Sequence, residues 1–346
     1  MEITKLSLKN FRLFKEANFS FSSGVNLIHG HNARGKTTIL EAMHLLSLGR
    51  SFRTHRFSDL HREGRLEMHV EADFVSRQVP QKLALHSVDD ERRIFHNSTL
   101  YPTFSSLIGL LPLVVLSTDD TLVKGPPLAR RTFLDMQIAL TDTSYLSLLQ
   151  RYGRALKQRN TLLRNGEKNG LAPWEQEMAK AAAQIIAKRK EVIAEQEKFI
   201  YPLFETLTKG VCTLQIHYAP KTTTVEALLE QYKLHQEREL EMGYTLTGPH
   251  RDEIGFILGG RDARSFASEG QKRLLLATLA LASWRWMQMK RNETPLMLLD
   301  DFGISLDEER RSYLLDQLST LGQVFITSTE PALFQGVRPL NSIEIL

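Results

Sequence analysis

Residues 25–48 read VNLIHGHNARGKTTILEAMHLLSL. Their middle, GHNARGKT at 30–37, matches the pattern G-x-x-x-x-G-K-[ST] of a phosphate-binding loop at every fixed position. An apolar run at 25–28 precedes this loop, and apolar residues at helical spacing follow it as far as Gly49. Strand, loop and helix in this order predict an α/β fold with a nucleotide-phosphate site at the loop.

The residue types of the loop explain its chemistry. The two glycines let the backbone turn tightly, so that successive N–H groups point at phosphate oxygens at the positive end of the following helix. We expect Lys36 to pair with the β and γ phosphates, and the hydroxyl of Thr37 to bind Mg²⁺. The residues expected to contact ATP are Gly30, His31, Asn32, Ala33, Arg34, Gly35, Lys36, Thr37 and Thr38.

The composition predicts a globular chain with a large core, divided into two lobes or domains. The chain has 346 residues, 42% of them apolar and 24% charged. No apolar run approaches the ~20 residues of a membrane span, so we expect a cytoplasmic protein with no membrane partner. The single cysteine, Cys212, excludes an internal disulfide and is expected to be a buried small apolar residue. A net charge of +4 weakly favours polyanionic partners.

The first part of the chain has the alternation of half-buried antiparallel strands. Residues 3–11 alternate apolar and polar side chains and form a predicted hairpin with the strand that carries Phe19 and Phe21. Residues 68–74 repeat the alternation. Between these strands, residues 50–65 hold five arginines, which fit either a solvated loop or contacts with a phosphate backbone.

A long helical tract follows near residue 118. Heptad-like apolar spacing on both sides of 165–173 predicts two antiparallel helices joined by that turn. Residues 151–200 hold 11 Lys and Arg against 6 Asp and Glu, which solvated helix faces explain as well as nucleic acid does.

The chain returns to strands and loops from residue 244. The segment 244–260, YTLTGPHRDEIGFILGG, predicts a strand pair around a Gly-Pro turn, and the apolar runs at 296–299 and 324–326 predict strands covered on both faces. The predicted domains are 1–118, an N-terminal ATPase lobe; 119–243, a helical arm; and 244–346, a C-terminal ATPase lobe.

Two carboxylates, Asp300 and Asp301, come directly after the run at 296–299. This pattern fits a Walker B strand, which brings an acid to the same sheet edge as the phosphate loop. Asp300 would hold Mg²⁺, and Asp301 would orient or deprotonate the attacking water. With Lys36 they form the predicted catalytic set. Aspartate is shorter than the glutamate of many related ATPases, so we expect slow turnover.

The segment SEGQKR at 268–273 begins a strongly apolar helix. A serine hydroxyl, a glycine and a helix N-terminus predict a second anion site, formed by Ser268, Gly270 and Gln271. A plain N-capped helix is the alternative. Two half-sites more than 200 residues apart favour an ATP-dependent homodimer in which each protomer closes over the other's ATP.

SEGQKR resembles the signature of ABC-type ATPases of the SMC class, and further stretches narrow the resemblance to the RecF family of bacterial recombination mediators. These stretches are NFRLF, GRSFRT, the D-x-x-L-V-x-G-P-P-x-x-R-R-x-F-L-D run at 119–135, TGPHRDE from Thr247, and LLDDFGISLDEERR. The resemblance implies an ABC-type P-loop head with mixed sheets and an inserted short helical arm. It also implies ATP-dependent dimerisation, slow hydrolysis, binding to double-stranded DNA near single-strand junctions, cooperation with a RecR-type mediator and a part in the SOS response.

The chain departs from the ABC pattern in three places. Ile304 stands where the D-loop serine is usual, with Ser305 one position later. Residues 327–329 stand where other ABC proteins carry a switch histidine, and Val114 and Val115 occupy the position of the Q-loop glutamine.

Several histidines have simpler interpretations. His29 is interpreted as strand packing and His31 as a solvent-facing loop residue. His250 and Arg251, in the GPHRD turn, fit either contact with DNA or a partner protomer, or a structural turn. No cluster of His, Cys, Asp and Glu has metal-ligand spacing, so Mg²⁺ with ATP is the only ion expected.

Three other functions share the phosphate loop. A small-molecule kinase has no use for SEGQKR, and a transporter ATPase normally needs a Q-loop and a switch histidine. A chromosome-organising protein has long coiled coils, whereas 119–243 allows arms of at most about 60 to 90 Å at 1.5 Å per helical residue.

Overall fold

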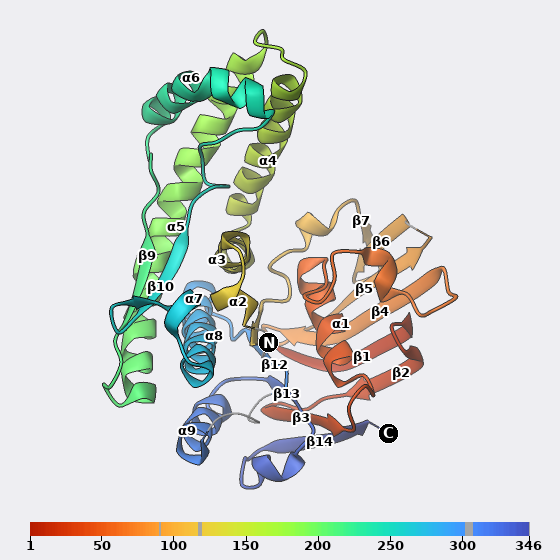
Figure 1. Ribbon diagram of the computed structural model, residues 1–346. Coiled ribbons are helices and arrows are strands. Elements are labelled where there is room, and N and C mark those ends of the chain that lie inside the picture. The colour runs from red at the N-terminus through yellow and green to blue at the C-terminus, as the bar shows by residue number, and fades with distance from the viewer. Residues whose placement is uncertain (90, 117–119, 302–306, 346) are drawn as a thin grey trace. The chain divides into compact units, whose positions relative to one another are not determined.

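The computed structural model describes residues 1–89, 91–116, 120–301 and 307–345. The chain divides into two compact units (Figure 1). The nucleotide-loop unit comprises Met1–Asp119 and Leu275–Leu346, and the inserted unit comprises Asp120–Leu274. Residues 244–274, expected in the C-terminal lobe, therefore belong to the inserted unit. The physical reason is that strand β10 (Ile254–Leu258) pairs with strand β9 (Leu214–Tyr218) of the arm region.

The nucleotide-loop unit contains a six-stranded antiparallel sheet with the order β2-β1-β4-β5-β6-β7. Its strands are β1 (Glu2–Phe11), β2 (Phe14–Ser20), β4 (Glu67–Ser76), β5 (Val79–Val88), β6 (Glu91–His96) and β7 (Thr99–Tyr101). The predicted hairpin is confirmed, because β1 and β2 pair antiparallel. Alternate side chains of β4, from Met68 to Phe74, are buried, as their alternation predicts.

The second sheet of this unit has five parallel strands in the order β14-β3-β13-β12-β8. They are β3 (Val25–Gly30), β8 (Leu113–Leu116), β12 (Leu296–Leu299), β13 (Val324–Ser328) and β14 (Leu340–Ile345). Strands β12 and β13 are buried at every residue, which confirms the prediction of strands covered on both faces. Because all five strands run in one direction, their carboxyl ends share one edge.

Helix α1 (Lys36–Leu48) lies between the two sheets. It contacts β4 and β5 of the antiparallel sheet and β3, β8 and β13 of the parallel sheet. All of its residues except Thr37 are buried, because neighbours surround it on every side. It ends at Gly49 in a left-handed conformation, as the sequence predicts.

A buried glutamine joins the strands that flank this helix. Gln323, fully buried, accepts from Ile3 N–H at 2.7 Å and donates to the carbonyls of Ile3 and Ser22 at 2.8 and 2.9 Å. The amide thus satisfies backbone groups of β1 immediately before β13 begins.

Shorter elements complete the nucleotide-loop unit. They are η1 (Phe57–Leu60), η2 (Phe104–Ser106), α9 (Glu308–Ser319), η3 (Pro331–Phe334) and most of α8 (Glu269–Arg291), whose first residues belong to the inserted unit. None of the helices in the described ranges is long and apolar enough to cross a membrane.

The inserted unit is built around a pair of long helices. Helices α4 (Thr143–Arg164) and α5 (Leu171–Thr208) pack against each other and are joined at 165–170, which confirms the predicted helix pair. At 1.5 Å per residue the 38 residues of α5 span roughly 57 Å. Figure 1 shows α6 against the same ends of both helices.

Smaller elements surround the long helices. They are α2 (Thr121–Lys124), α3 (Pro127–Thr141), α6 (Val225–Met242), β11 (Arg261–Asp262) and α7 (Ala263–Phe266), together with β9 and β10. The sequence patterns do not predict β9 or α6.

The predicted strand pair over 244–260 is wrong in its first half. Residues 244–253 form turns, and β10 pairs with β9 and β11 instead. Two guanidinium groups take the backbone carbonyls of this stretch: Arg131 donates to Asp252 O at 2.6 Å, and Arg189 donates to Pro249 O at 2.8 Å. Because side chains satisfy these carbonyls, the segment needs no partner strand.

Candidate nucleotide-binding site

The phosphate-loop pattern lies between β3 and α1, at the carboxyl edge of the parallel sheet. Both fixed glycines are required by the backbone. Gly30 has φ 147°, and a Cβ there would lie 2.3 Å from Ile345 O. Gly35 has φ 102°, and a Cβ there would lie 2.7 Å from the ring of Phe14. Other residues would therefore be strained by both conformation and space.

The lysine of the loop is held inside it. Lys36 is 8% exposed, and its ammonium donates to the carbonyls of Gly30 and His31, each at 2.8 Å. The loop residues His31, Asn32, Ala33 and Arg34 are exposed. The loop therefore presents a positive charge at a helix N-terminus, which suits phosphate oxygens. Thr38 is buried at the base of the loop.

The second predicted motif lies against the first. Thr37 Oγ1 donates to Asp300 Oδ1 at 2.7 Å, although the two residues are 263 positions apart. Thr327, at the end of β13, donates to the same carboxylate oxygen at 2.8 Å. Thr327 is one of the three residues at the position where other ABC proteins carry the switch histidine. The sequence patterns do not predict its contact with Asp300.

Asp301 follows Asp300 and departs from the strand direction. Its N–H donates to Thr327 Oγ1 at 2.8 Å, and its φ is 55°, in the left-handed region. Asp300 N–H continues the β12–β8 pairing by donating to Leu116 O at 2.9 Å. The next residues, which include Ile304 and Ser305 of the D-loop, lie outside the described residues.

The hydroxyl of Thr37 and the carboxylate of Asp300 are the oxygen donors that Mg²⁺ prefers, and their oxygens lie 2.7 Å apart. They fit the predicted magnesium ligands. Within the part of the chain that the structure describes, there is no group of three or more His, Cys, Asp and Glu that could hold a metal ion.

The SEGQKR segment forms a capping box at the start of α8. Ser268 N–H donates to Gln271 Oε1 at 2.9 Å, and Gln271 N–H donates to Ser268 Oγ at 3.3 Å. Ser268 and Gly270 are exposed. The N-capped helix is therefore present, and the exposed serine and glycine stay compatible with an anion site.

Glu269 pairs with two lysines beside this cap. Its carboxylate accepts from Lys272 at 2.8 Å and from Lys124 at 3.0 Å. These hydrogen bonds lower the pKa of Glu269 to about 2. The start of α8 is thereby tied to α2 within the inserted unit.

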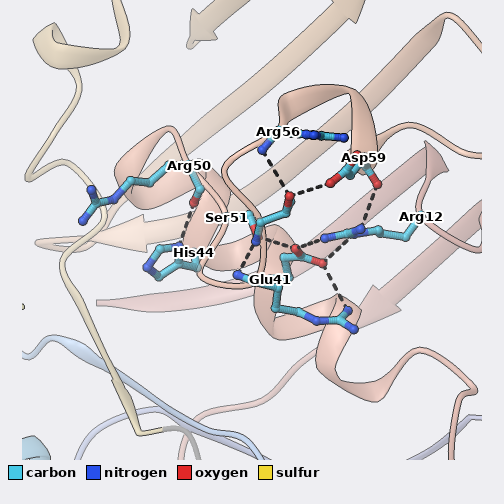
Figure 2. Close-up of polar contacts among 9 residues, drawn as sticks. Arg12, Glu41, His44, Arg50, Ser51, Arg56 and Asp59 are labelled. Atoms are coloured by element: carbon cyan, nitrogen blue, oxygen red, sulfur yellow. Dashed lines mark hydrogen bonds and ion pairs between the residues drawn. The ribbon is translucent and has the colours of Figure 1, made fainter. Parts of the chain in front are cut away.

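A buried carboxylate on α1 ties the phosphate-loop helix to the two motifs NFRLF and GRSFRT. Glu41 is fully buried and accepts two hydrogen bonds from Arg12, at 2.9 and 2.5 Å. Figure 2 shows Glu41 between Arg12 and Ser51, which donates to the same carboxylate. Arg53 Nη1 lies 3.5 Å from Glu41. The bidentate pair satisfies a charge that would be costly to bury alone.

The loop that carries the five arginines is ordered by these contacts. The hydroxyl of Thr54 donates a hydrogen bond to the carboxylate of Asp59. Arg12 Nη1 donates to the backbone carbonyl of Asp59 at 2.8 Å (Figure 2). The side chains of Arg50, Arg53 and Arg56 are nevertheless exposed. A structured loop with exposed arginines is compatible with a solvated loop and with contacts to a phosphate backbone, the two alternatives that the sequence leaves open.

The family described as "RecF/RecN/SMC N terminal domain" matches residues 2–345. A protein named DNA replication and repair protein RecF, from Protochlamydia amoebophila, is 42% identical over 340 residues, which cover 96% of this chain and 95% of the relative. Its namesake from Symbiobacterium thermophilum is 36% identical over 344 residues, 95% of this chain and 92% of the relative.

The chain belongs to the RecF family. The solved structure described as the recombination mediator protein RecF-ATP in the RecFOR pathway has a TM-score of 0.89 and 29% identity, over 95% of this chain and 92% of that one. The Smc head domain from Pyrococcus furiosus has a TM-score of 0.58 at 16% identity, over 100% of this chain and 94% of that one, which supports the fold alone. The predicted ABC-type head is confirmed, with one parallel sheet, one antiparallel sheet and helical segments.

The RecF-like run at 119–135 supplies structural braces. Arg130 is 4% exposed and donates to the carbonyls of Gly125 at 3.0 Å and, through Nε, of Ile254 at 2.5 Å. Asp135 forms a bidentate pair with the buried Arg189 of α5, at 2.9 and 2.8 Å. Asp119, the first residue of the run, lies outside the described residues.

His250, in the RecF-like GPHRD turn, has a structural role. Its Nδ1 accepts from the hydroxyl of Tyr152 at 2.5 Å, and its Nε2 donates to Thr245 O at 3.2 Å. Burial lowers the pKa of His250 to about 4, so the ring is neutral. Arg251 is exposed and its guanidinium lies 5.0 Å from the ring centroid of Tyr244.

The exposure of two histidines beside the phosphate loop and of the single cysteine can be compared with the sequence predictions. His31 is exposed, as predicted, and His29 is half-buried, with Nε2 2.9 Å from Ser342 Oγ of the neighbouring strand. The prediction that Cys212 is buried is wrong. It is half-buried between α5 and β9, with Sγ 4.0 Å from Gln271 Nε2, because this connection runs along the surface.

The RecF-family unit that holds the nucleotide loop should lose stability in mild acid through His44. Burial lowers the pKa of His44 to about 4, and its neutral ring bonds to Arg50 O at 2.8 Å. The unfolded chain binds this proton near pH 6.5, so the contribution is complete above that pH and is lost as pH falls towards 4. The loss should reach about 3 kcal/mol.

Urea denaturation between pH 7 and 4 tests this expectation. His44→Gln should have a flatter pH dependence than the wild type, whereas His55→Gln, at an exposed position of the loop that follows α1, should keep the wild-type slope. Equal slopes for His44→Gln and the wild type would contradict the assignment.

Proposed function

We propose that this chain is an ATP-dependent, DNA-binding recombination mediator in which ATP acts mainly as a switch. The observation that carries the proposal is the 2.7 Å hydrogen bond between Thr37 and Asp300, which joins a phosphate loop to a Walker B carboxylate in a RecF-family fold. A relative of the same fold was solved with ATP.

Each residue of the site has a proposed role towards ATP and Mg²⁺. Lys36 exchanges its bonds to the Gly30 and His31 carbonyls for the β and γ phosphates. Thr37 and Asp300 hold Mg²⁺, which neutralises phosphate charge. Asp301 orients or deprotonates the attacking water, and its short side chain keeps hydrolysis slow.

The switch requires two copies of the chain. The capping box of Ser268 and Gln271 belongs to the inserted unit, and Lys36 belongs to the nucleotide-loop unit. We propose that the exposed Ser268 and Gly270 of one protomer bind the γ phosphate held by the partner's loop. ATP then stabilises the dimer, and hydrolysis returns it to monomers.

The closed dimer is proposed to bind double-stranded DNA near single-strand junctions and to cooperate with a RecR-type mediator in loading recombinase. It would act in the cytoplasm, in DNA replication, DNA repair and the SOS response. Exposed cations on two elements support the DNA contact. Arg50, Arg53 and Arg56 lie on the loop after α1, and Arg154 and Lys157 lie on α4.

The dimer is tested by sedimentation velocity with ATP, ADP or neither, with and without gapped DNA. ATP should convert the wild type to dimers. Lys36→Ala should stay monomeric because its loop loses the positive charge that pairs with the phosphates. Ser268→Arg should also stay monomeric, although it still binds ATP in its own loop. Lys15→Ala, at an exposed position of β2, is the matched control and should dimerise. A wild type that stays monomeric with saturating ATP and DNA would refute the switch.

Hydrolysis is tested separately with Asp301→Asn. The amide cannot deprotonate water, so the rate of phosphate release should fall by about 10²-fold or more. ATP-dependent dimers should persist, because Asp301 is not needed to hold the nucleotide. Unchanged phosphate release by this variant would remove Asp301 from the mechanism.

The DNA contact predicts a strong dependence on salt. Binding to gapped duplex, followed by fluorescence anisotropy, should weaken linearly on a plot of log affinity against log salt concentration. Replacing both Arg154 and Lys157 by Ala should reduce the slope by about one to two. A wild-type affinity that does not change with salt would reject these contacts.

A further inference from the structure

The inserted unit contains a cavity of about 590 Å³ whose lining belongs entirely to that unit. Its floor is the outward face of the β9–β10 pair, where His217 lies opposite Gly255. The turn at 246–253, α7 and the start of α3 form its walls. A cavity of this size accommodates a ligand of drug-like dimensions or a short peptide segment.

Four cations line this cavity: Arg130, Lys221, Arg251 and Arg264. Among the described residues, Lys221, Arg251 and Arg264 have no carboxylate within ion-pair distance. Arg251 stacks on Tyr244, so its guanidinium is oriented but keeps its hydrogen-bond donors. The cavity therefore holds positive charge that the chain itself does not neutralise.

Arg130 is the buried anchor of the set. It is 4% exposed, and its Nε and Nη1 are engaged by backbone carbonyls. Its Nη2 is 4.0 Å from Glu253, beyond hydrogen-bond distance. Arg130 also lines the cavity, so Nη2 is the nitrogen left to donate a charge-assisted hydrogen bond to a carboxylate there.

The acidic residues of the lining limit how much negative charge the ligand can carry. Asp252 already pairs with Arg189, which leaves Glu253 and Asp262 against the four cations. The excess of about two positive charges suits one or two carboxylates. A nucleic-acid backbone, with a phosphate at every nucleotide, carries more negative charge than this excess neutralises, and a duplex is too wide to enter.

Apolar residues lie between the charges. Leu246 and Ile257 line the same cavity, and Ile257 lies on the same face of β10 as Gly255. They offer surface for an apolar side chain beside each bound carboxylate, as in grooves that recognise acidic motifs through arginine clusters. A small inorganic anion would leave this apolar surface without a contact.

We propose that this cavity is a docking site for a short acidic peptide segment of a partner protein, in which carboxylates alternate with apolar side chains. The carboxylates pair with Arg130 and Arg264, and the apolar side chains pack on the floor formed by β10. This site is independent of the proposed ATP switch, because every residue of it lies in the inserted unit.

The test is fluorescence polarisation with a labelled peptide of sequence Asp-Leu-Asp-Phe-Asp-Leu-Asp and full-length protein. The wild type should bind saturably, with a dissociation constant below about 1 mM. Arg264→Glu should weaken binding at least about tenfold, since it places a carboxylate against the ligand's own. Lys233→Glu, an equal charge change at an exposed site on α6, should bind as the wild type.

A second variant blocks the cavity without changing charge. A Cβ on Gly255 would meet only the Cβ of His217, at 3.8 Å, so Gly255→Leu fills the floor without a backbone clash. It should abolish peptide binding and leave nucleotide binding, followed with a fluorescent ATP analogue, unchanged. The second measurement shows that the variant is folded.

Three outcomes overturn the proposal. The first is no saturable binding by the wild type up to about 1 mM peptide. The second is equal binding of the peptide with every Asp replaced by Asn, which would remove the charge recognition. The third is that a 12-nucleotide oligothymidylate displaces the peptide and that Gly255→Leu abolishes binding of this oligonucleotide. Both results together would make the cavity a nucleic-acid site.

Discussion

The hydrogen bond from Thr37 to Asp300 is the constraint on which the site depends. It joins the N-terminus of α1 to the end of β12, two segments separated by most of the chain. Three parallel strands make it possible, because β3 and β12 both pair with β13 and end at the same edge. Thr327, near the end of β13, donates to the same carboxylate, so the first turn of α1 and the ends of β12 and β13 meet at one acid. Phosphate loop, acid and the proposed magnesium ligands are therefore a consequence of sheet topology.

The same logic extends to the motifs that resemble the RecF family. Arg12 and Ser51 both bond to Glu41, one helical turn beyond the phosphate loop, so the arginine-bearing loop is oriented from inside the nucleotide-loop unit. In the inserted unit, Arg130 and the Asp135–Arg189 pair satisfy backbone carbonyls and buried charge around the GPHRD turn. Much of what makes these stretches recognisable is thus structural support. The groups left for ligands are the outward ones, such as Arg264 and Arg251 on the cavity wall.

The sequence predicted the elements whose signal is local. The loop between β3 and α1, the β1–β2 hairpin, the α4–α5 pair and the buried strands β12 and β13 follow from spacing and alternation alone. It failed at 244–253, where guanidinium groups from distant helices take the carbonyls that a strand would have paired. It also failed for Cys212, since a thiol's burial depends on where its connection runs. Thr327 could have been suspected only from its place at the end of an apolar run.

The sequence by itself determined the phosphate loop, the paired aspartates and the family, because each depends on residue types at short fixed spacings. Only the tertiary structure decided which aspartate oxygen meets Thr37, which arginines brace the fold and which line a cavity. The physical reason is that a guanidinium has the same local sequence signal whether it is buried against carbonyls or directed at a ligand. Its role is set by the partners that folding brings within hydrogen-bond distance. Such partners include Ile254 for Arg130, Asp135 for Arg189 and, for the hydroxyl of Thr37, Asp300, each 54 or more residues away.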